Sequence, residues 1–161
     1  MAILTNVGRA AWAAVIQDLP LFLAWGTGDA AWDTTAIPPS LSDTALVAEV
    51  GRAIVTTSGF AEADDEGLIA TPTGNYTLVA GPTPNLYLRF DFGFADAADQ
   101  TIREVGLFIN TTLVAGLPPG QRYFLPDQVD EPGTLLAVER FALPLSRSPL
   151  VRQQFEFVLV I

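Results

Sequence analysis

The chain has 161 residues, half of them hydrophobic, and its 18 acidic residues against 8 basic ones give a net charge of −10. All the basic residues are arginines, and the sequence contains no histidine, lysine or cysteine. An acidic surface repels phosphate, which argues against nucleic-acid binding and against anionic membrane surfaces. Without histidine and cysteine, this chain cannot build a Ser-His-Asp or Cys-His catalytic centre, a disulfide, or a zinc site with histidine or thiolate ligands.

The length predicts a single domain covering residues 1–161, which is large enough to bury a core of its own. The first residues, Met1–Arg9, lack the basic start and long apolar core of a signal peptide. The apolar runs are far shorter than the roughly 20 residues that a membrane-spanning helix requires. We therefore expect no membrane insertion.

The first predicted element is a helix over Val7–Gln17, because Thr5 or Asn6 can cap its start and Asp18-Leu-Pro20 ends it. A short buried strand over Leu21–Trp25 follows, and then a tight turn at Gly26–Asp29 and an irregular loop.

A second helix is predicted over Asp43–Val50, where Ser40 or Ser42 precedes the segment and can act as its cap. Leu46 and Val50 would lie on one face of this helix, one turn apart. The hydrophobic period then changes to two, which indicates strands from there onward.

The clearest strand is Asn85–Phe94, in which apolar residues alternate with a mostly polar set. The inward face would hold Leu86, Leu88, Phe90, Phe92 and Phe94, and the other face Tyr87, Arg89, Asp91 and Gly93. Further strands are predicted over Arg52–Ser58, Gly74–Val79, Arg103–Ile109, Leu135–Leu143 and Arg152–Ile161, with a long turn-rich excursion over Gly116–Gly133. The predicted fold class is α+β, with two N-terminal helices packed on a mainly antiparallel β-sheet.

Two features of the sequence could indicate a ligand site, but each is more typical of a turn. The acidic cluster Glu62–Glu66 lacks the alternating spacing of a calcium loop, and Asp96 and Asp99 flank another turn. Gly26–Ala31 matches Gly-x-Gly-x-x-Ala, but a poor helix-forming segment follows it, whereas a dinucleotide site needs a helix there. We expect no catalytic residue, no metal and no cofactor.

Large apolar side chains are the candidates for contacts with other subunits. Tryptophans could stack on sugars, although packing or an assembly interface is the more common use of such residues. The C-terminal strand is apolar on both faces, so both faces need cover. The excursion is longer than most loops that lack a function. The predicted subunit-interface residues are Trp12, Trp32, Tyr123, Phe124, Phe155, Phe157, Leu159 and Ile161.

Three motifs together resemble the N-terminal, baseplate-docking domain of phage tail-collar and tail-fibre proteins. They are Ile3-Leu-Thr-Asn-Val-Gly-Arg9, then Ala24-Trp-Gly-Thr-Gly-Asp29 ahead of Leu41–Val50, and Ile102-Arg-Glu-Val-Gly-Leu-Phe108. The resemblance covers about residues 3–109, and residues 110–161 are unassigned. The turn is Gly-Thr-Gly-Asp where the family commonly has Gly-Asp-Gly, and the long shaft and tip of a fibre are absent from this chain.

The resemblance implies a structural subunit of a phage tail baseplate, made in the host cytoplasm and carried in the virion tail. Such a connector would dock tail fibres or join baseplate components, with other tail proteins as partners and further copies of the chain in a homo-oligomer. The alternative is a carbohydrate-binding, host-recognition module of a tail fibre, which would need an exposed aromatic platform. A carboxylate-dependent glycan hydrolase would need two acids facing each other across a cleft.

Overall fold

The computed structural model describes residues 1–161, and strands dominate it. It contains twelve strands, one α-helix and two short 3-10 helices. The expected α+β fold with two N-terminal helices is therefore wrong, because the chain is mostly β and forms only the first of these helices. The chain divides into two compact units, which we call unit 1 (Met1–Leu19, Val55–Phe90 and Gln154–Ile161) and unit 2 (Pro20–Ile54 and Asp91–Gln153).

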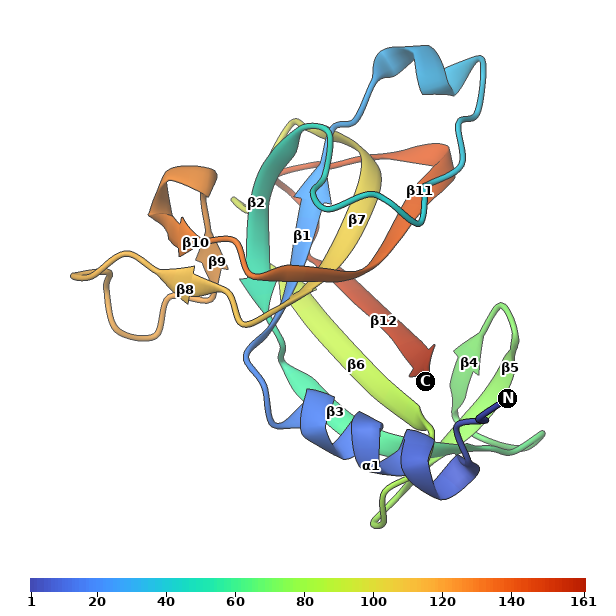
Figure 1. Ribbon diagram of the computed structural model, residues 1–161. Helices are drawn as coiled ribbons and strands as arrows, with labels where there is room; N and C mark the ends of the chain where they lie inside the picture. The colour runs from blue at the N-terminus through green and yellow to red at the C-terminus, as the bar shows by residue number, and fades with distance from the viewer. The chain divides into compact units, whose positions relative to one another are not determined.

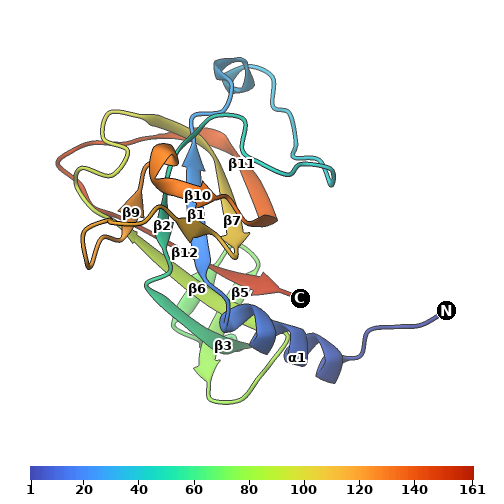
Figure 2. The ribbon, with the colours of Figure 1, turned by 60° about the vertical axis from the view of Figure 1, so that its left-hand side comes forward.

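Figure 1 labels the α-helix and the strands, and Figure 2 gives a second view of them. In order they are α1 (Asn6–Gln17), β1 (Leu21–Gly26), η1 (Ala30–Asp33), β2 (Glu49–Ile54), β3 (Thr57–Ala63), β4 (Ile69–Thr71), β5 (Gly74–Val79), β6 (Asn85–Phe92), β7 (Thr101–Ile109), β8 (Thr112–Leu113), β9 (Tyr123–Phe124), η2 (Pro126–Gln128), β10 (Val129–Glu131), β11 (Thr134–Ser146) and β12 (Gln153–Val160).

Helix α1 confirms the first predicted element. The backbone N–H of Gly8 donates to the Thr5 hydroxyl at 3.2 Å, so Thr5 is the cap. The side chains of Ala10, Ala13 and Ile16 are buried, and α1 contacts β3 of the same unit. No helix in the structure is both long and apolar enough to cross a membrane.

Unit 1 contains a sheet with the strand order β12-β6-β3-β5-β4, so β6 is an interior strand between β12 and β3. Leu86, Leu88 and Phe90 are fully buried along β6. Two details of the predicted register are wrong. Phe94 lies beyond the end of β6 and is 47% exposed, while Tyr87 on the expected polar face is 6% exposed.

The burial of Tyr87 has a clear cause. Its ring packs in a cluster with Ala61 and Tyr76, and its hydroxyl donates to the Glu156 carboxylate at 2.7 Å. This sheet is therefore covered on both faces around β6, a property that alternation of residue types along one strand does not show.

Unit 2 contains an antiparallel sheet with the order β11-β7-β1-β2-β9. All six residues of the central strand β1 are buried. The Trp25 ring stacks on Phe92 with centroids 3.7 Å apart, and Phe22 meets Phe124 edge to face at 5.9 Å. Aromatic packing thus contributes to the core of this unit.

The predicted helix over Asp43–Val50 does not form, because tertiary contacts hold the segment as irregular chain running into β2. Leu46 inserts into a cluster with Ala24 and Phe108, and the neighbouring backbone N–H groups bond to a side chain of β7. An isolated helix of this length is marginal, so these contacts decide its conformation. The single strand predicted over Arg52–Ser58 is likewise two strands, because β2 ends at Ile54 and β3 begins at Thr57.

The turn-rich excursion Gly116–Gly133 contains β9, η2 and β10. Its base is fastened by Arg52, which is 2% exposed. The Arg52 guanidinium donates to both carboxylate oxygens of Glu49 at 2.8 and 2.7 Å, and to the Thr111 hydroxyl and the Pro132 carbonyl at 2.8 Å each. One arginine therefore ties β2 to the end of the excursion at Pro132 and to Thr111, which follows β7.

Candidate functional site

The segment from Thr27 to Ala48, which we call the β1–β2 loop, connects two neighbouring strands of unit 2 by a long path. Apart from η1 it has no regular structure. Loops of this length in compact domains usually serve a function. Three charged side chains from β7 and β11 hold it in place, and they define the candidate site.

Arg103 of β7 holds the first part of this loop. Its guanidinium donates to both carboxylate oxygens of Asp33 at 2.7 and 2.8 Å and to the Thr27 carbonyl at 3.1 Å. The hydrogen bond from Arg103 lowers the pKa of Asp33 below its ordinary value. The Asp29 carboxylate accepts from the Ala31 N–H at 2.8 Å and caps η1. The predicted turn at Gly26–Asp29 is instead the last residue of β1 and an irregular segment that leads into η1.

Arg140 of β11 holds the middle of the loop. Its guanidinium lies 4.4 Å from the centre of the Trp32 ring, a cation–π contact. It also donates to the carbonyls of Ile37 and Pro38 at 3.3 and 3.1 Å, and to Asp43 at 3.2 Å. Arg140 thus contacts four residues of the loop and holds them against strand β11.

Glu104 of β7 holds the end of the loop. This carboxylate is 1% exposed, and its Oε1 accepts from the backbone N–H groups of Val47 and Ala48 at 2.8 and 3.1 Å. Gly26 lies against the same side chain, where an added Cβ would collide with it. The motif Ile102–Phe108 therefore has a structural role, because two of its charged residues fasten the β1–β2 loop.

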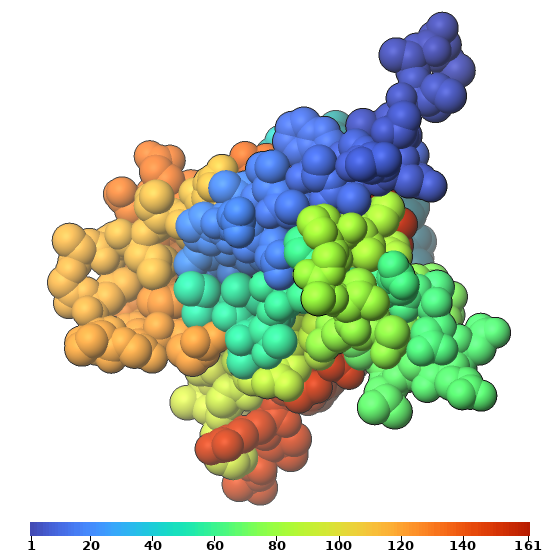
Figure 3. Space-filling model, turned by 90° about the horizontal axis from the view of Figure 1, so that it is seen from below, coloured from blue at the N-terminus to red at the C-terminus, as the bar shows by residue number.

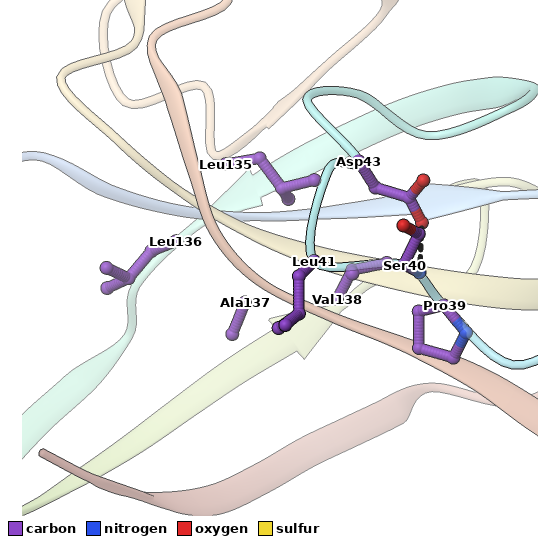
Figure 4. A pocket seen from close by; sticks show the side chains of 8 residues that line it. All are labelled: Pro39, Ser40, Leu41, Asp43, Leu135, Leu136, Ala137 and Val138. Atoms are coloured by element: carbon purple, nitrogen blue, oxygen red, sulfur yellow. Dashed lines mark hydrogen bonds between the residues drawn. The ribbon is translucent and has the colours of Figure 1, made fainter.

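The loop and strand β11 together form a groove of about 300 Å³. Figure 4 shows its lining, with the loop residues on one side of β11 and Leu136 directed away from them. Strand β11 is the edge of its sheet, so no strand pairs with its outer side. Leu41 at the loop tip is fully exposed. The groove is lined by Pro39, Ser40, Leu41, Asp43, Leu135, Leu136, Ala137 and Val138.

The groove offers binding chemistry. Asp43 is its one ionisable side chain, and that carboxylate already accepts from Arg140 and from the Ser40 N–H. The remaining lining is mostly apolar, and the adjoining strand edge carries backbone donors and acceptors. Such an arrangement suits an extended peptide segment that adds to the sheet edge while its side chains enter the groove.

The predicted interface residues lie on separate elements. Trp12 is 54% exposed on α1, and Trp32 is half-buried under Arg140. Four of the others lie on β12 or just after it and are half-buried: Phe155, Phe157, Leu159 and Ile161. Phe157 stacks on Phe90, and the Ile161 carbonyl accepts from Arg9 at 2.7 Å. Contact of these residues with another subunit stays a prediction.

Tyr123 and Phe124 pack inside unit 2. The Tyr123 hydroxyl donates to the Val50 carbonyl at 3.2 Å, and Phe124 is 4% exposed. Burial raises the pKa of Tyr123 well above its ordinary range, and the Asp96 and Glu49 carboxylates add to this effect. Within the described chain, these two side chains serve the core.

Sequence reasoning missed Leu41 and the segment Leu135–Val138 as candidate site residues. Two signals were present in the sequence. One is the length of the stretch between the strand ending at Trp25 and the next strand, and the other is the run Leu135-Leu-Ala-Val138 at one end of a strand. Only the fold shows that these two segments meet.

The acidic residues singled out in the sequence stabilise turns. Asp64 accepts from the Glu66 N–H at 3.0 Å in the turn between β3 and β4, and Asp96 accepts from the Gly93 N–H at 2.6 Å. No group of three or more acidic side chains is arranged to hold a metal ion.

Comparison with known proteins identifies the family. A family described as "Baseplate wedge 3 tail fiber network component" matches residues 1–161, the whole of the chain. A search of curated proteins found no match. The family match confirms the resemblance to phage baseplate and tail-fibre proteins and extends it over residues 110–161, and it indicates a location in the virion tail and association with other baseplate and fibre components. The chain belongs to the family of baseplate wedge tail fibre network components.

Proposed function

We propose that this chain is a non-catalytic connector that joins a tail-fibre protein to the baseplate wedge. It is made in the host cytoplasm and acts in the virion tail by holding its partner through the groove between the β1–β2 loop and β11. The observation that carries this proposal is an exposed loop that three charged side chains hold rigid beside an open strand edge.

Rigidity of the loop favours binding. Because Arg103, Arg140 and Glu104 already fix the loop, a partner would not have to order it on association, and that ordering cost opposes binding. Leu41 is then presented in one position as an apolar anchor. A connector in a particle must hold its partner for long periods, which suits a preorganised surface of this kind.

The partner proposed for the groove is an extended, largely apolar segment of a tail-fibre protein without acidic residues. The chain carries a net charge of −10, and Glu139 follows the groove on β11, so an acidic segment would be repelled. The apolar lining favours aliphatic side chains, and the open edge of β11 supplies backbone hydrogen bonds to a strand.

Tail particles assembled with variant chains test this proposal. Leu41→Asp places a charge at the loop tip without touching the three anchors, and Leu68→Asp is the matched control because Leu68 is equally exposed in the turn between β3 and β4. Electron microscopy should show baseplates that lack fibres with Leu41→Asp and retain them with Leu68→Asp. Fibres present at normal frequency on Leu41→Asp particles would contradict the proposed groove.

Carbohydrate recognition has weaker support. Stacking on a sugar needs exposed aromatic faces, but Trp25 is fully buried and the Trp32 ring is covered by Arg140. Trp12 is the one strongly exposed tryptophan, and the apolar side chains around it on α1 provide no hydrogen-bonding groups for a sugar. A glycan hydrolase is disfavoured because the acids noted in the sequence cap turns.

A further inference from the structure

Helix α1 carries apolar residues on its buried face and on its outer face, and its polar residues are Asn6, Arg9 and Gln17. One face, with Ala10, Ala13 and Ile16, is buried within unit 1. Arg9 is the single charged residue of the helix, and its guanidinium bonds to the Ile161 carbonyl at 2.7 Å. A helix with apolar residues on two opposite faces normally has both faces covered. The outer face of α1 is therefore suited to contact with another surface.

The outer face carries large side chains in the open. Val7 is 80% exposed, Trp12 54% and Val15 52%. Figure 3 shows α1 and the residues before it, in dark blue, where the first residues project from the helix. Ile3 and Leu4 in that projecting segment are also exposed, at 84% and 48%. Large apolar side chains exposed together on one segment are typical of a protein–protein contact.

A shallow apolar hollow lies on the same face. It has a volume of about 280 Å³ and is lined by Gly8, Ala11, Trp12 and Val15. These positions follow the i, i+3, i+4, i+7 spacing of one helix stripe. Two of the lining residues, Gly8 and Ala11, are small, and Trp12 supplies a large ring beside them. The face thus presents a projection and a recess next to each other, which is the shape that a two-fold contact requires.

We propose that the outer face of α1 binds the same face of a second copy of this chain. The two helices cross near Ala11, and Trp12 of each copy fills the hollow of the other. The patch itself adds no charge repulsion against this occupant. The chain carries −10, so two copies repel each other over most of their surface, yet residues 1–17 contain no acidic side chain. This patch is therefore suited to close approach by a like-charged copy.

This contact goes beyond the connector role, which concerns a different protein and a different surface. It can be tested on the purified chain alone, so its failure would leave the fibre-docking groove untouched. Loss of fibres in the Leu41→Asp experiment would likewise leave the α1 contact untouched.

Sedimentation analysis of the full chain over a range of concentrations tests the pairing. We expect a monomer–dimer equilibrium that strengthens with added salt, because salt screens the repulsion between two acidic copies but not the apolar contact. Val15→Arg should weaken the dimer at least tenfold, whereas Leu143→Arg, at a position 84% exposed on β11, should not. A chain that stays monomeric, or a dimer that persists with Val15→Arg, would overturn the proposal.

Two further variants keep the test independent of helix stability. Ala11→Phe fills the hollow while keeping the face apolar, so it should abolish the dimer if shape decides the contact, and the added change Trp12→Ala should restore it. Because the chain has no cysteine, Ala11→Cys provides a unique thiol near the proposed axis. Mild oxidation should link this variant rapidly into dimers and leave Leu143→Cys largely unlinked. Equal linking of both, or an unaffected dimer with Ala11→Phe, would reject the specific α1 pairing.

Discussion

The two units stabilise their cores by different means. Unit 2 contains three buried charged side chains, Arg52, Glu104 and Arg147, whereas unit 1 contains none. In unit 1 the buried polar side chain is Thr83, whose hydroxyl donates to the Ala61 carbonyl at 2.7 Å. Unit 1 is thus held by apolar packing of a helix and strands, and unit 2 combines its apolar core with buried charges.

The difference follows from the connections in each unit. Long irregular segments have backbone groups with no partner in a strand or helix, and buried groups of this kind must be bonded. Arg147 provides such bonds, because its guanidinium donates to the backbone carbonyls of Gly93, Asp96 and Val151. A charged side chain with several donors can fasten several points of a loop at once, which a hydrophobic residue cannot do.

The largest effect should come from removing a buried charge in unit 2. Arg52→Ala leaves Glu49, Thr111 and the Pro132 carbonyl without their shared donor, and the loss should be about 4 kcal/mol of unfolding free energy. Urea denaturation measures it, and hydrogen exchange should show release of the excursion. Arg152→Ala, at an exposed arginine over the Phe94 ring, is the control and should cost less than about 1 kcal/mol. A small loss of unfolding free energy with Arg52→Ala would show that buried charges do not distinguish the stability of unit 2 from that of unit 1.

A cavity in unit 1 should cost somewhat less. Leu88 is fully buried in β6 and its side chain has no polar atom, so Leu88→Ala should lower the unfolding free energy by about 3 kcal/mol. Hydrogen exchange should rise in β3 and β6. If the excursion of unit 2 were instead the first segment to exchange, apolar packing would not be what holds unit 1.

A more conservative change tests the role of the motif on β7. Glu104→Gln keeps the size of the side chain but removes the charge that strengthens the bonds from Val47 and Ala48, and it adds a buried N–H₂ group. We expect a loss of about 2 kcal/mol and faster exchange at those two amides. Glu139→Gln, at an exposed position of β11, is the matched control. Unchanged exchange at Val47 and Ala48 would show that Glu104 does not hold the loop.

The smallest effect concerns acid pH. Arg103 lowers the pKa of Asp33 below its ordinary value of 3.8, so the anchor is at full strength above that value and is lost as pH falls through the lower value of the folded chain. Nuclear magnetic resonance should show the Trp32 indole signal shift in that acid window. Asp33→Asn should remove this step, and Asp127→Asn should retain it. A step that persists in Asp33→Asn would assign the transition to another group.

Local patterns predicted most of the strands correctly. The predicted strand over Gly74–Val79 matches β5, and the start of β6 at Asn85 is also as predicted. Residue type alone narrowed the helix cap to Thr5 or Asn6, and the structure selects Thr5. The candidate site was harder to predict, because the groove joins residues near position 40 to residues near position 137, and no local pattern relates them.

Sequence by itself determined those features whose cause lies within a few residues: alternation along β6, the capped start of α1, and turns at glycine and aspartate. Tertiary structure decided the rest. Residues 43–48 do not form the predicted helix, because Leu46 packs against Ala24 and Phe108 and the Glu104 carboxylate accepts hydrogen bonds from the neighbouring backbone. The burial of Arg52 and Glu104 likewise depends on partners that only folding brings together. A charged side chain is buried without a large loss of stability only where several groups form hydrogen bonds with it.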